Sequence, residues 1–132
     1  MRPRGLEELA GRGRGLREVM LDKGLSALGD ALVNFAYSLA LSLDERRPQG
    51  ARLDNRVLSE ALRASGLREL APRRMDRHDL ADAAEALLAF GWLAGLVDFW
   101  SIVEALRGPD VLEKLSSLLR RVARGLLPSL ST

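Results

Sequence analysis

The sequence has no cysteine and a single histidine, His78, among its 132 residues. Without cysteine the chain can form no disulfide bond, no thiolate nucleophile and no thiolate metal site. With only one histidine, a zinc site would need almost entirely carboxylate ligands, which is uncommon. Any metal site in this chain must therefore be built mainly from oxygen ligands.

Aromatic residues are also scarce, at 5% of the chain, whereas hydrophobic residues make up 47%. The core must be built from leucine, alanine and valine. Leucine and alanine favour helices, while strands are usually marked by β-branched and aromatic residues. The composition predicts an all-α protein, and the length allows one domain with a real core but not two.

No uninterrupted apolar run is long enough to cross a membrane. The longest, Leu25 to Leu43, is interrupted by Asp30 and Asn34, and a span needs roughly 20 residues with few or no charges. The basic N-terminus is not followed by the apolar region of a secretory signal. We expect a cytoplasmic protein without membrane contact, in which this run is a buried helix.

Lysine is nearly absent: of the 20 basic residues, 18 are arginine. The net charge is only +2, yet the pI is about 9.6. Arginine offers a planar fork suited to phosphate, so nucleic acid is a candidate partner. A GC-rich or heat-adapted source would also explain the arginine count. Several arginine groups flank the apolar helices, and we interpret the last, C-terminal group as solvated charge. The arginines fall into four groups: Arg2, Arg4, Arg12, Arg14 and Arg17; Arg46, Arg47, Arg52 and Arg56; Arg68, Arg73, Arg74 and Arg77; Arg120, Arg121 and Arg124.

Two long apolar helices dominate the predicted architecture. The first covers about residues 23–43, with Asp22 as its N-cap and apolar residues at three- and four-residue spacing, which form one continuous face: Leu25, Leu28, Leu32, Phe35, Leu39 and Leu43. The second covers about residues 77–96 and is rich in alanine.

Shorter helices are predicted around these two. One begins at Asp54 and ends at Gly66, one is capped by Asp98, and a last one follows Gly108 and ends near Leu126. Glycines allow at most one helical turn in residues 1–20, a basic N-terminal arm, so residues 21–132 form the domain. The prediction is a bundle of five or six helices.

Three acidic residues stand in unusual places in the two long helices. Asp30 lies in the middle of the first, and Asp82 and Glu85 lie three apart, on one face of the second. Burying a carboxylate is costly unless it is paired or binds a cation, and neither helix has a basic residue nearby on its C-terminal side. Mg²⁺ or Mn²⁺, which take oxygen ligands, would resolve this. For each acid alone, solvent exposure or a distant arginine is a sufficient explanation.

The segments around these acids resemble motifs of the ribonuclease III family. Leu28-Gly29-Asp30-Ala31-Leu32 is similar to the central signature, and Leu80 to Leu87 (LADAAEAL) is similar to the second catalytic motif. Between them, residues 53–58 (LDNRVL) resemble a segment in which the family has an asparagine at a helix start. The resemblance covers roughly residues 21–97 and is nearest to short archaeal proteins related to ribonuclease III.

The resemblance implies a ribonuclease III catalytic-domain fold and metal-dependent hydrolysis of phosphodiester bonds in structured or double-stranded RNA. It assigns Asp30, Asp82 and Glu85 to catalysis and to Mg²⁺ or Mn²⁺ binding. It also implies a homodimer, because the family pairs its signature helices across the RNA duplex. The 23–43 helix is compatible with this, since it is apolar on more than one face.

One position departs from the family pattern: Ser26 stands where a glutamate usually lies, four residues before the signature aspartate. Serine can hold a water but adds no charge. Two further residues are candidate auxiliaries, His78 as a phosphate ligand or a helix-start surface residue, and Asn34 as a water-orienting or interface residue. We expect the aromatic residues Trp92, Phe99 and Trp100 to pack in the core or dimer rather than to stack on bases.

Two other functions stay open. A non-catalytic RNA-binding or ribosome-associated protein would keep the fold after losing the chemistry with the missing glutamate. A purely structural helical dimer would leave the three acids without a role.

Overall fold

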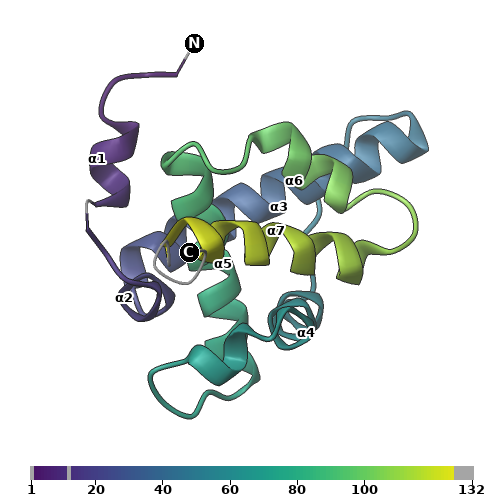
Figure 1. The fold of residues 1–132 in the computed structure, drawn as a ribbon. Helices are drawn as coiled ribbons and strands as arrows, with labels where there is room; N and C mark the ends of the chain where they lie inside the picture. Colours follow the sequence, from purple (N-terminus) through teal and green to yellow (C-terminus); the bar gives the residue numbers. More distant parts are fainter. Residues whose placement is uncertain (1, 12, 127–132) are drawn as a thin grey trace.

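The computed structural model describes residues 2–11 and 13–126, and this part of the chain is helical without strands. The elements, shown in Figure 1, are α1 (Leu6–Ala10), α2 (Leu16–Met20), α3 (Lys23–Glu45), α4 (Asn55–Ser65), the 3₁₀ helix η1 (Leu67–Leu70), α5 (Arg77–Leu93), α6 (Phe99–Ala105) and α7 (Val111–Leu126). The predicted all-α class is confirmed. The described chain has seven α-helices where five or six were expected, because two five-residue helices form before residue 21.

Helix starts follow the predicted caps. The carboxylates of Asp22, Asp54 and Asp98 accept backbone N–H bonds at the starts of α3, α4 and α6. Gly66 ends α4 in the left-handed conformation, at φ 81°. The start of α5 is fixed by a reciprocal pair, in which Asp76 and Asp79 each accept the other's backbone N–H.

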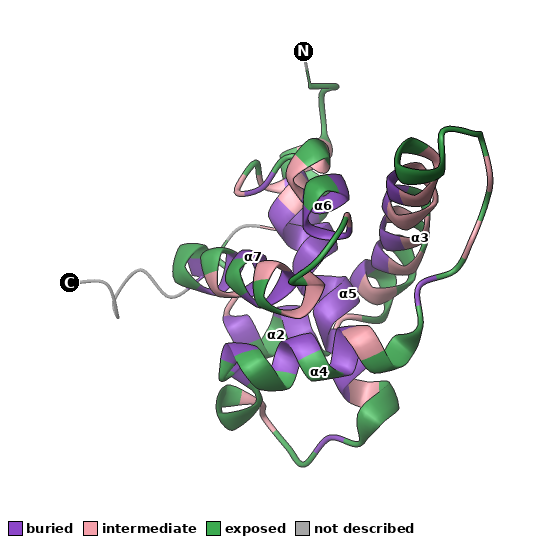
Figure 2. Ribbon diagram, turned by 90° about the vertical axis from the view of Figure 1, so that its right-hand side faces the viewer, coloured by how far each residue is buried: buried purple, intermediate pink, exposed green. Residues whose placement is uncertain are grey.

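Helix α5 is the centre of the domain. It packs against α3, α4, α7 and α2, and its residues from Ala83 to Gly91 are all buried (Figure 2). Its five alanines allow the neighbouring helices to approach closely on several sides. The helix ends at Leu93, three residues earlier than expected, and the turn that follows contains Gly95 at φ 78°.

Helix α3 buries only part of the leucine-rich face expected, since Leu32 and Leu39 pack against the core only partly buried. The residues facing the core are Leu25, Gly29, Val33, Ala36 and Ala40. By contrast, Leu28, Phe35 and Leu43 are exposed, with 40%, 59% and 46% of their surface accessible. The small residues of α3 allow it to lie close to α5, and the large side chains of Leu28, Phe35 and Leu43 on α3 point away from α5. The expectation of a buried helix was therefore right for only one side.

By length and composition alone, α3 could cross a membrane, and it is the one helix of the described residues that could. A helix that packs in a helical domain passes the same test. Here Asp30 and Asn34, near the middle of α3, make polar contacts with the loop before α4, as described below.

The segment before α3 packs against the rest of the fold. Ala10, Leu16, Val19 and Met20 are buried in the same core, and α2 lies against α5. Arg2 reaches the other end of α5, where it donates to the carbonyl oxygen of Leu93 and lies over the ring of Trp92. The division at residue 20 stays a prediction.

Candidate functional site

The site begins where α3 crosses α5. Gly29 lies so close to the backbone of Glu85 that a Cβ atom at position 29 would overlap the Glu85 carbonyl group. The next residue along α3 is Asp30. The close crossing thus brings a carboxylate of the first long helix beside one of the second, as the sequence predicted for these two acids.

Glu85 is the one buried acid among the described residues, with 4% of its surface exposed. Burial raises the pKa of its carboxyl, and so do a hydrogen bond with Asp30 and the negative charges of Asp30 and Asp82. The charge of Arg52 acts in the opposite direction, and the result is a pKa of about 8. Near neutral pH this carboxyl therefore carries a proton in the absence of a cation.

Asp82 and Ser26 share a cavity. Both are half-buried, and both line a small cavity of about 30 Å³. The same cavity is lined by Asp22 and Asp79 and by the basic residues Lys23 and Arg73. A cavity of this size holds about one water molecule. Position 26 therefore lies beside Asp82, one of the three predicted site acids, and serine brings no charge there; Asp30 and Glu85 do not line this cavity.

Asp30 is held by two neighbours. Its Oδ1 accepts from Nδ2 of Asn34 at 3.2 Å and from a guanidinium nitrogen of Arg52 at 3.3 Å. Asn34 in turn accepts the backbone N–H of Leu53 at 2.8 Å, so its amide orients Asp30 and the loop before α4 together. The sequence shows no basic residue on the C-terminal side of these acids in either helix, and the alternative of an arginine from elsewhere is met at Asp30 by Arg52 of that loop.

In the sequence Arg52 is one of a group of loop arginines, and nothing local distinguishes it from the others. Its contact with Asp30 joins residues 22 positions apart. The spacing of Gly29 and Asp30 was visible in the sequence, but the reason for that glycine is visible only in the crossing with Glu85.

His78 lies on the exposed first turn of α5, where it has no hydrogen-bond partner among the described residues. It is not the cap of the helix, since Asp76 and Asp79 have that role. The structure leaves it on the surface, one turn before Asp82. Its part in the site stays a prediction.

The donors suit a hard divalent cation, although no three Asp, Glu or His side chains in residues 2–11 and 13–126 are arranged as a ready site for one ion. Mg²⁺ commonly takes one or two carboxylates and completes its shell with waters and a substrate phosphate. Asp30 and Glu85 supply such a pair, and the negative charges of Asp30 and Asp82 that raise the pKa of Glu85 are charges that a cation would offset. The residues present therefore fit the cation predicted from the sequence.

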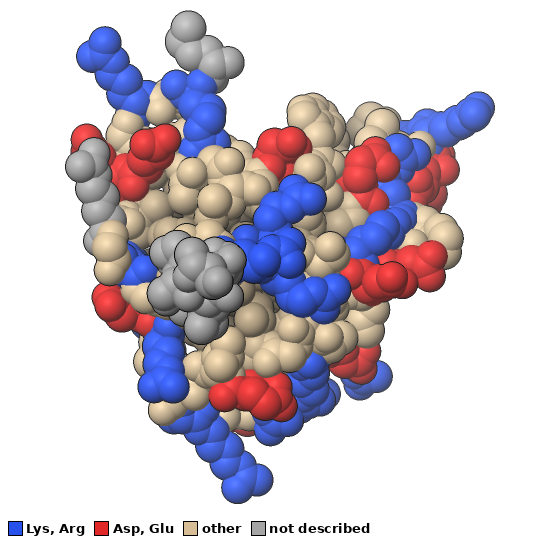
Figure 3. All heavy atoms as spheres, viewed as in Figure 1, with Lys and Arg blue, Asp and Glu red and all other residues tan. Residues whose placement is uncertain are grey.

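Basic side chains also gather far from this crossing. Figure 3 shows Lys and Arg over α7, which lies in front of α3 in this view. Arg121 and Arg124 on α7 are exposed, as expected for solvated charge. Arg12 of the N-terminal group lies outside the described residues.

A comparison with protein families matches residues 23–126 to ribonuclease III. The chain belongs to the ribonuclease III family. The match runs from the start of α3 to the end of α7, and so includes both acidic helices. A comparison with curated proteins finds no match. Members of this family are RNA-processing endoribonucleases that generally use a divalent metal.

Proposed function

We propose that this protein is a Mg²⁺- or Mn²⁺-dependent endoribonuclease that hydrolyses double-stranded or structured RNA in the cytoplasm. The observation that carries the proposal is the pairing of Asp30 with the buried Glu85 at the Gly29 crossing, in a chain of the ribonuclease III family. A buried glutamate beside a second carboxylate is costly for a purely structural helix bundle, because the buried carboxyl must stay protonated or be neutralised.

The residues have distinct parts in this function. Asp30 and Glu85 would hold the cation, and Asp82, the third predicted ligand, would add negative charge beside them. When bound, the cation supplies positive charge that stabilises the phosphate in the transition state and helps to activate water. Asn34 fixes the orientation of Asp30. Glu85 would hold the cation as a carboxylate, its proton released to solvent.

The exposed face of α3 supports a homodimer. Phe35 stacks on Phe99 of α6 with ring centroids 5.5 Å apart, and Phe99 meets Trp100 edge to face at the same distance. Trp100 is 62% exposed. Leu28 and Leu43 extend this apolar surface along α3. Pairing two copies about a two-fold axis is the commonest way to cover such a surface.

The test is incubation of the purified protein with long double-stranded RNA in Mg²⁺, in Mn²⁺ and in EDTA. We expect metal-dependent cleavage that Glu85→Gln and Asp30→Asn abolish. Glu60→Gln is the matched control, because Glu60 is an exposed acid on α4. Thermal stability in Mn²⁺ gives a second readout: a bound cation raises Tm of the wild type, and it leaves the Tm of Glu85→Gln nearly unchanged.

One observation favours a second function, binding of RNA without cleavage. Ser26 lies beside Asp82 without adding charge, and the described acids form no ready site for one ion. Salt-sensitive RNA binding with no cleavage in either metal, and no effect of Mn²⁺ on Tm, would select this second function.

A further inference from the structure

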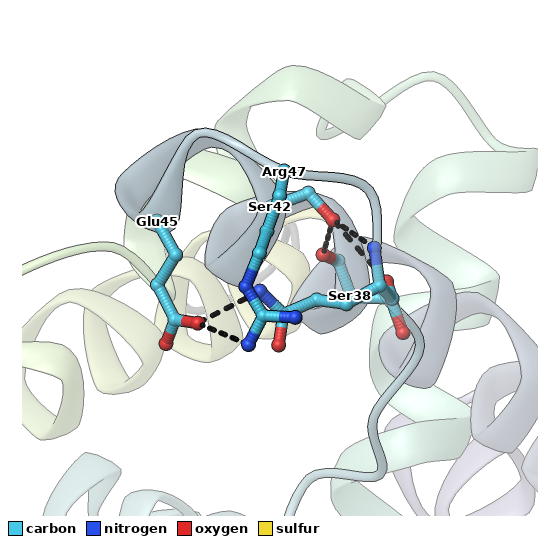
Figure 4. Close-up of polar contacts among 5 residues, drawn as sticks. Ser38, Ser42, Glu45 and Arg47 are labelled. Carbon is cyan, nitrogen blue, oxygen red and sulfur yellow. Dashed lines mark hydrogen bonds and ion pairs between the residues drawn. The ribbon is translucent and has the colours of Figure 1, made fainter.

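A ladder of hydrogen bonds joins α3 to the segment that follows it. Backbone N–H groups of Gln49, Ala51 and Leu53 donate to the side chains of Ser42, Ser38 and Asn34, at 3.0, 2.9 and 2.8 Å. Figure 4 shows the outer end of the ladder, at Ser42, whose hydroxyl also lies near the carbonyl of Ser38. Each serine hydroxyl also lies within hydrogen-bond distance of a carbonyl one turn earlier on α3.

The ladder forms because the spacing of its acceptor side chains along α3 matches the spacing of its N–H groups along the extended loop. Its side chains stand four residues apart on α3, a rise of about 6 Å. Its N–H groups stand two residues apart in the segment, which spans about 6.6 Å when extended. The two chains therefore stay in register over three rungs, so this loop is held against the helix without secondary structure of its own.

The ladder fixes the place of Arg52. Its two neighbours in the sequence, Ala51 and Leu53, both donate hydrogen bonds of the ladder, and Leu53 is also buried in the core. The backbone of Arg52 is thus held beside Asp30, whereas its side chain is 74% exposed and free to turn. Its guanidinium lies 3.3 Å from Oδ1 of Asp30.

We propose that Arg52 neutralises Asp30 while the site is empty, and that it turns to an RNA backbone phosphate when a divalent cation binds Asp30. This inference rests on the proposed function. An exposed ion pair is weak, so the guanidinium leaves at little cost. An arginine next to a bound cation is repelled by it and finds a bidentate acceptor in the phosphate. The anchored backbone keeps the guanidinium within reach of both positions.

Competition with the cation gives two effects of opposite sign. In Arg52→Gln, Mn²⁺ meets no competing positive charge at Asp30, so it should bind more tightly, by up to about fivefold given the strength of exposed pairs. The same variant should bind duplex RNA more weakly once the cation is present. A structural defect in the loop would weaken both.

The experiment measures Mn²⁺ binding directly, from the electron paramagnetic resonance signal of free Mn²⁺, without RNA. The variants are Arg52→Gln, Arg52→Lys and the matched control Arg47→Gln. Arg47 is an exposed, ion-paired arginine of the same loop, but its partner is Glu45. We expect tighter Mn²⁺ binding only in Arg52→Gln.

RNA binding is then measured at 4 °C in EDTA and in Ca²⁺, with a gel to verify that the RNA stays intact. In EDTA the loss of affinity in Arg52→Gln should be smaller than in Ca²⁺, because Asp30 competes with the phosphate for the guanidinium of Arg52 when no cation is bound. In Ca²⁺ the variant should bind more weakly, and its plot of log K against log salt should be shallower by about 0.9, the value for one duplex phosphate contact. Arg52→Lys should recover part of this difference.

Three outcomes decide the matter. If Arg52→Gln binds Mn²⁺ no more tightly than the wild type, or if its RNA affinity falls equally in EDTA and Ca²⁺, the role of Arg52 is wrong while the proposed function stands. If the wild type binds no Mn²⁺, both are wrong. Opposite changes in Mn²⁺ and RNA affinity, absent from Arg47→Gln, support both.

Discussion

Gly29 lies against the backbone carbonyl of Glu85, in a gap that no side chain can enter. The contact explains why a glycine stands in the middle of a 23-residue helix, where it costs helix propensity. It also sets the distance between α3 and α5 at the point where their acids meet. Gly29 therefore permits the close crossing, and the crossing places the carboxylate of Asp30 beside that of Glu85.

Gly29→Ala should destabilise the protein by about 1–3 kcal/mol, because the methyl group forces α3 and α5 apart. In an open helix position the same change would instead be favourable. Chemical denaturation measures the difference. Gly50→Ala is the control, since a Cβ there meets no atom within 4 Å, and it should change stability little. If Gly29→Ala were as stable as Gly50→Ala, the close crossing would be wrong.

The buried Glu85 makes stability depend on pH in an unusual direction. Its pKa is about 8 in the folded chain and near 4.5 when unfolded. Between these values the folded state keeps a proton that the unfolded state has lost, so the free energy of unfolding falls as pH rises. The slope from this group is about 1.4 kcal/mol per pH unit. The contribution is constant below the lower value and above the upper one.

Glu85→Gln, which cannot ionise, should remove that slope. Denaturation of both proteins in EDTA, at several pH values from 4.5 to 8, gives the difference directly and cancels the other titrating groups. The variant should gain on the wild type steadily as pH rises. Parallel curves would mean that Glu85 is not a buried, proton-holding group.

Much of the fold could be predicted because its signals are local. The caps at Asp22, Asp54 and Asp98 each act on a backbone N–H two or three residues away. The buried side of α3 could not be predicted in the same way. Leucines at helical spacing mark an apolar face, but Gly29 and Ala36 decide which face approaches α5.

The candidate site also has a part that could be predicted from the sequence and a part that could not. Three acids on apolar helices were recognisable from the cost of burying them, and the structure brings Asp30 and Glu85 together. Arg52 was not recognisable, because its contact depends on the register of a loop with α3. The polar residues Asn34, Ser38 and Ser42 recur every fourth residue, but nothing in the loop sequence shows which of its N–H groups they bind.

Phe35→Glu should convert the proposed dimer to a monomer, because it puts a charge in the centre of the apolar surface formed by α3 and α6. Light scattering after size exclusion measures the mass. The fold should persist, since Phe35 is 59% exposed. Glu60→Gln, on exposed α4 surface, is the control. A wild type that is monomeric at micromolar concentration would contradict the dimer.

Ser26→Glu tests whether the missing carboxylate limits the site. The new side chain would enter the region around the 30 Å³ cavity, which Asp82, Lys23 and Arg73 also line. Without metal the added charge should lower Tm, because it joins Asp82 and Asp79. With Mn²⁺ it should add a ligand, so that Mn²⁺ binds more tightly and RNA is cleaved faster at low metal concentration. Ser26→Gln, of similar size but uncharged, separates charge from bulk and should show neither gain. If Ser26→Glu and Ser26→Gln behave alike in Mn²⁺ binding and in cleavage, position 26 lies too far from the cation, and the activity of this chain does not depend on a fourth acid.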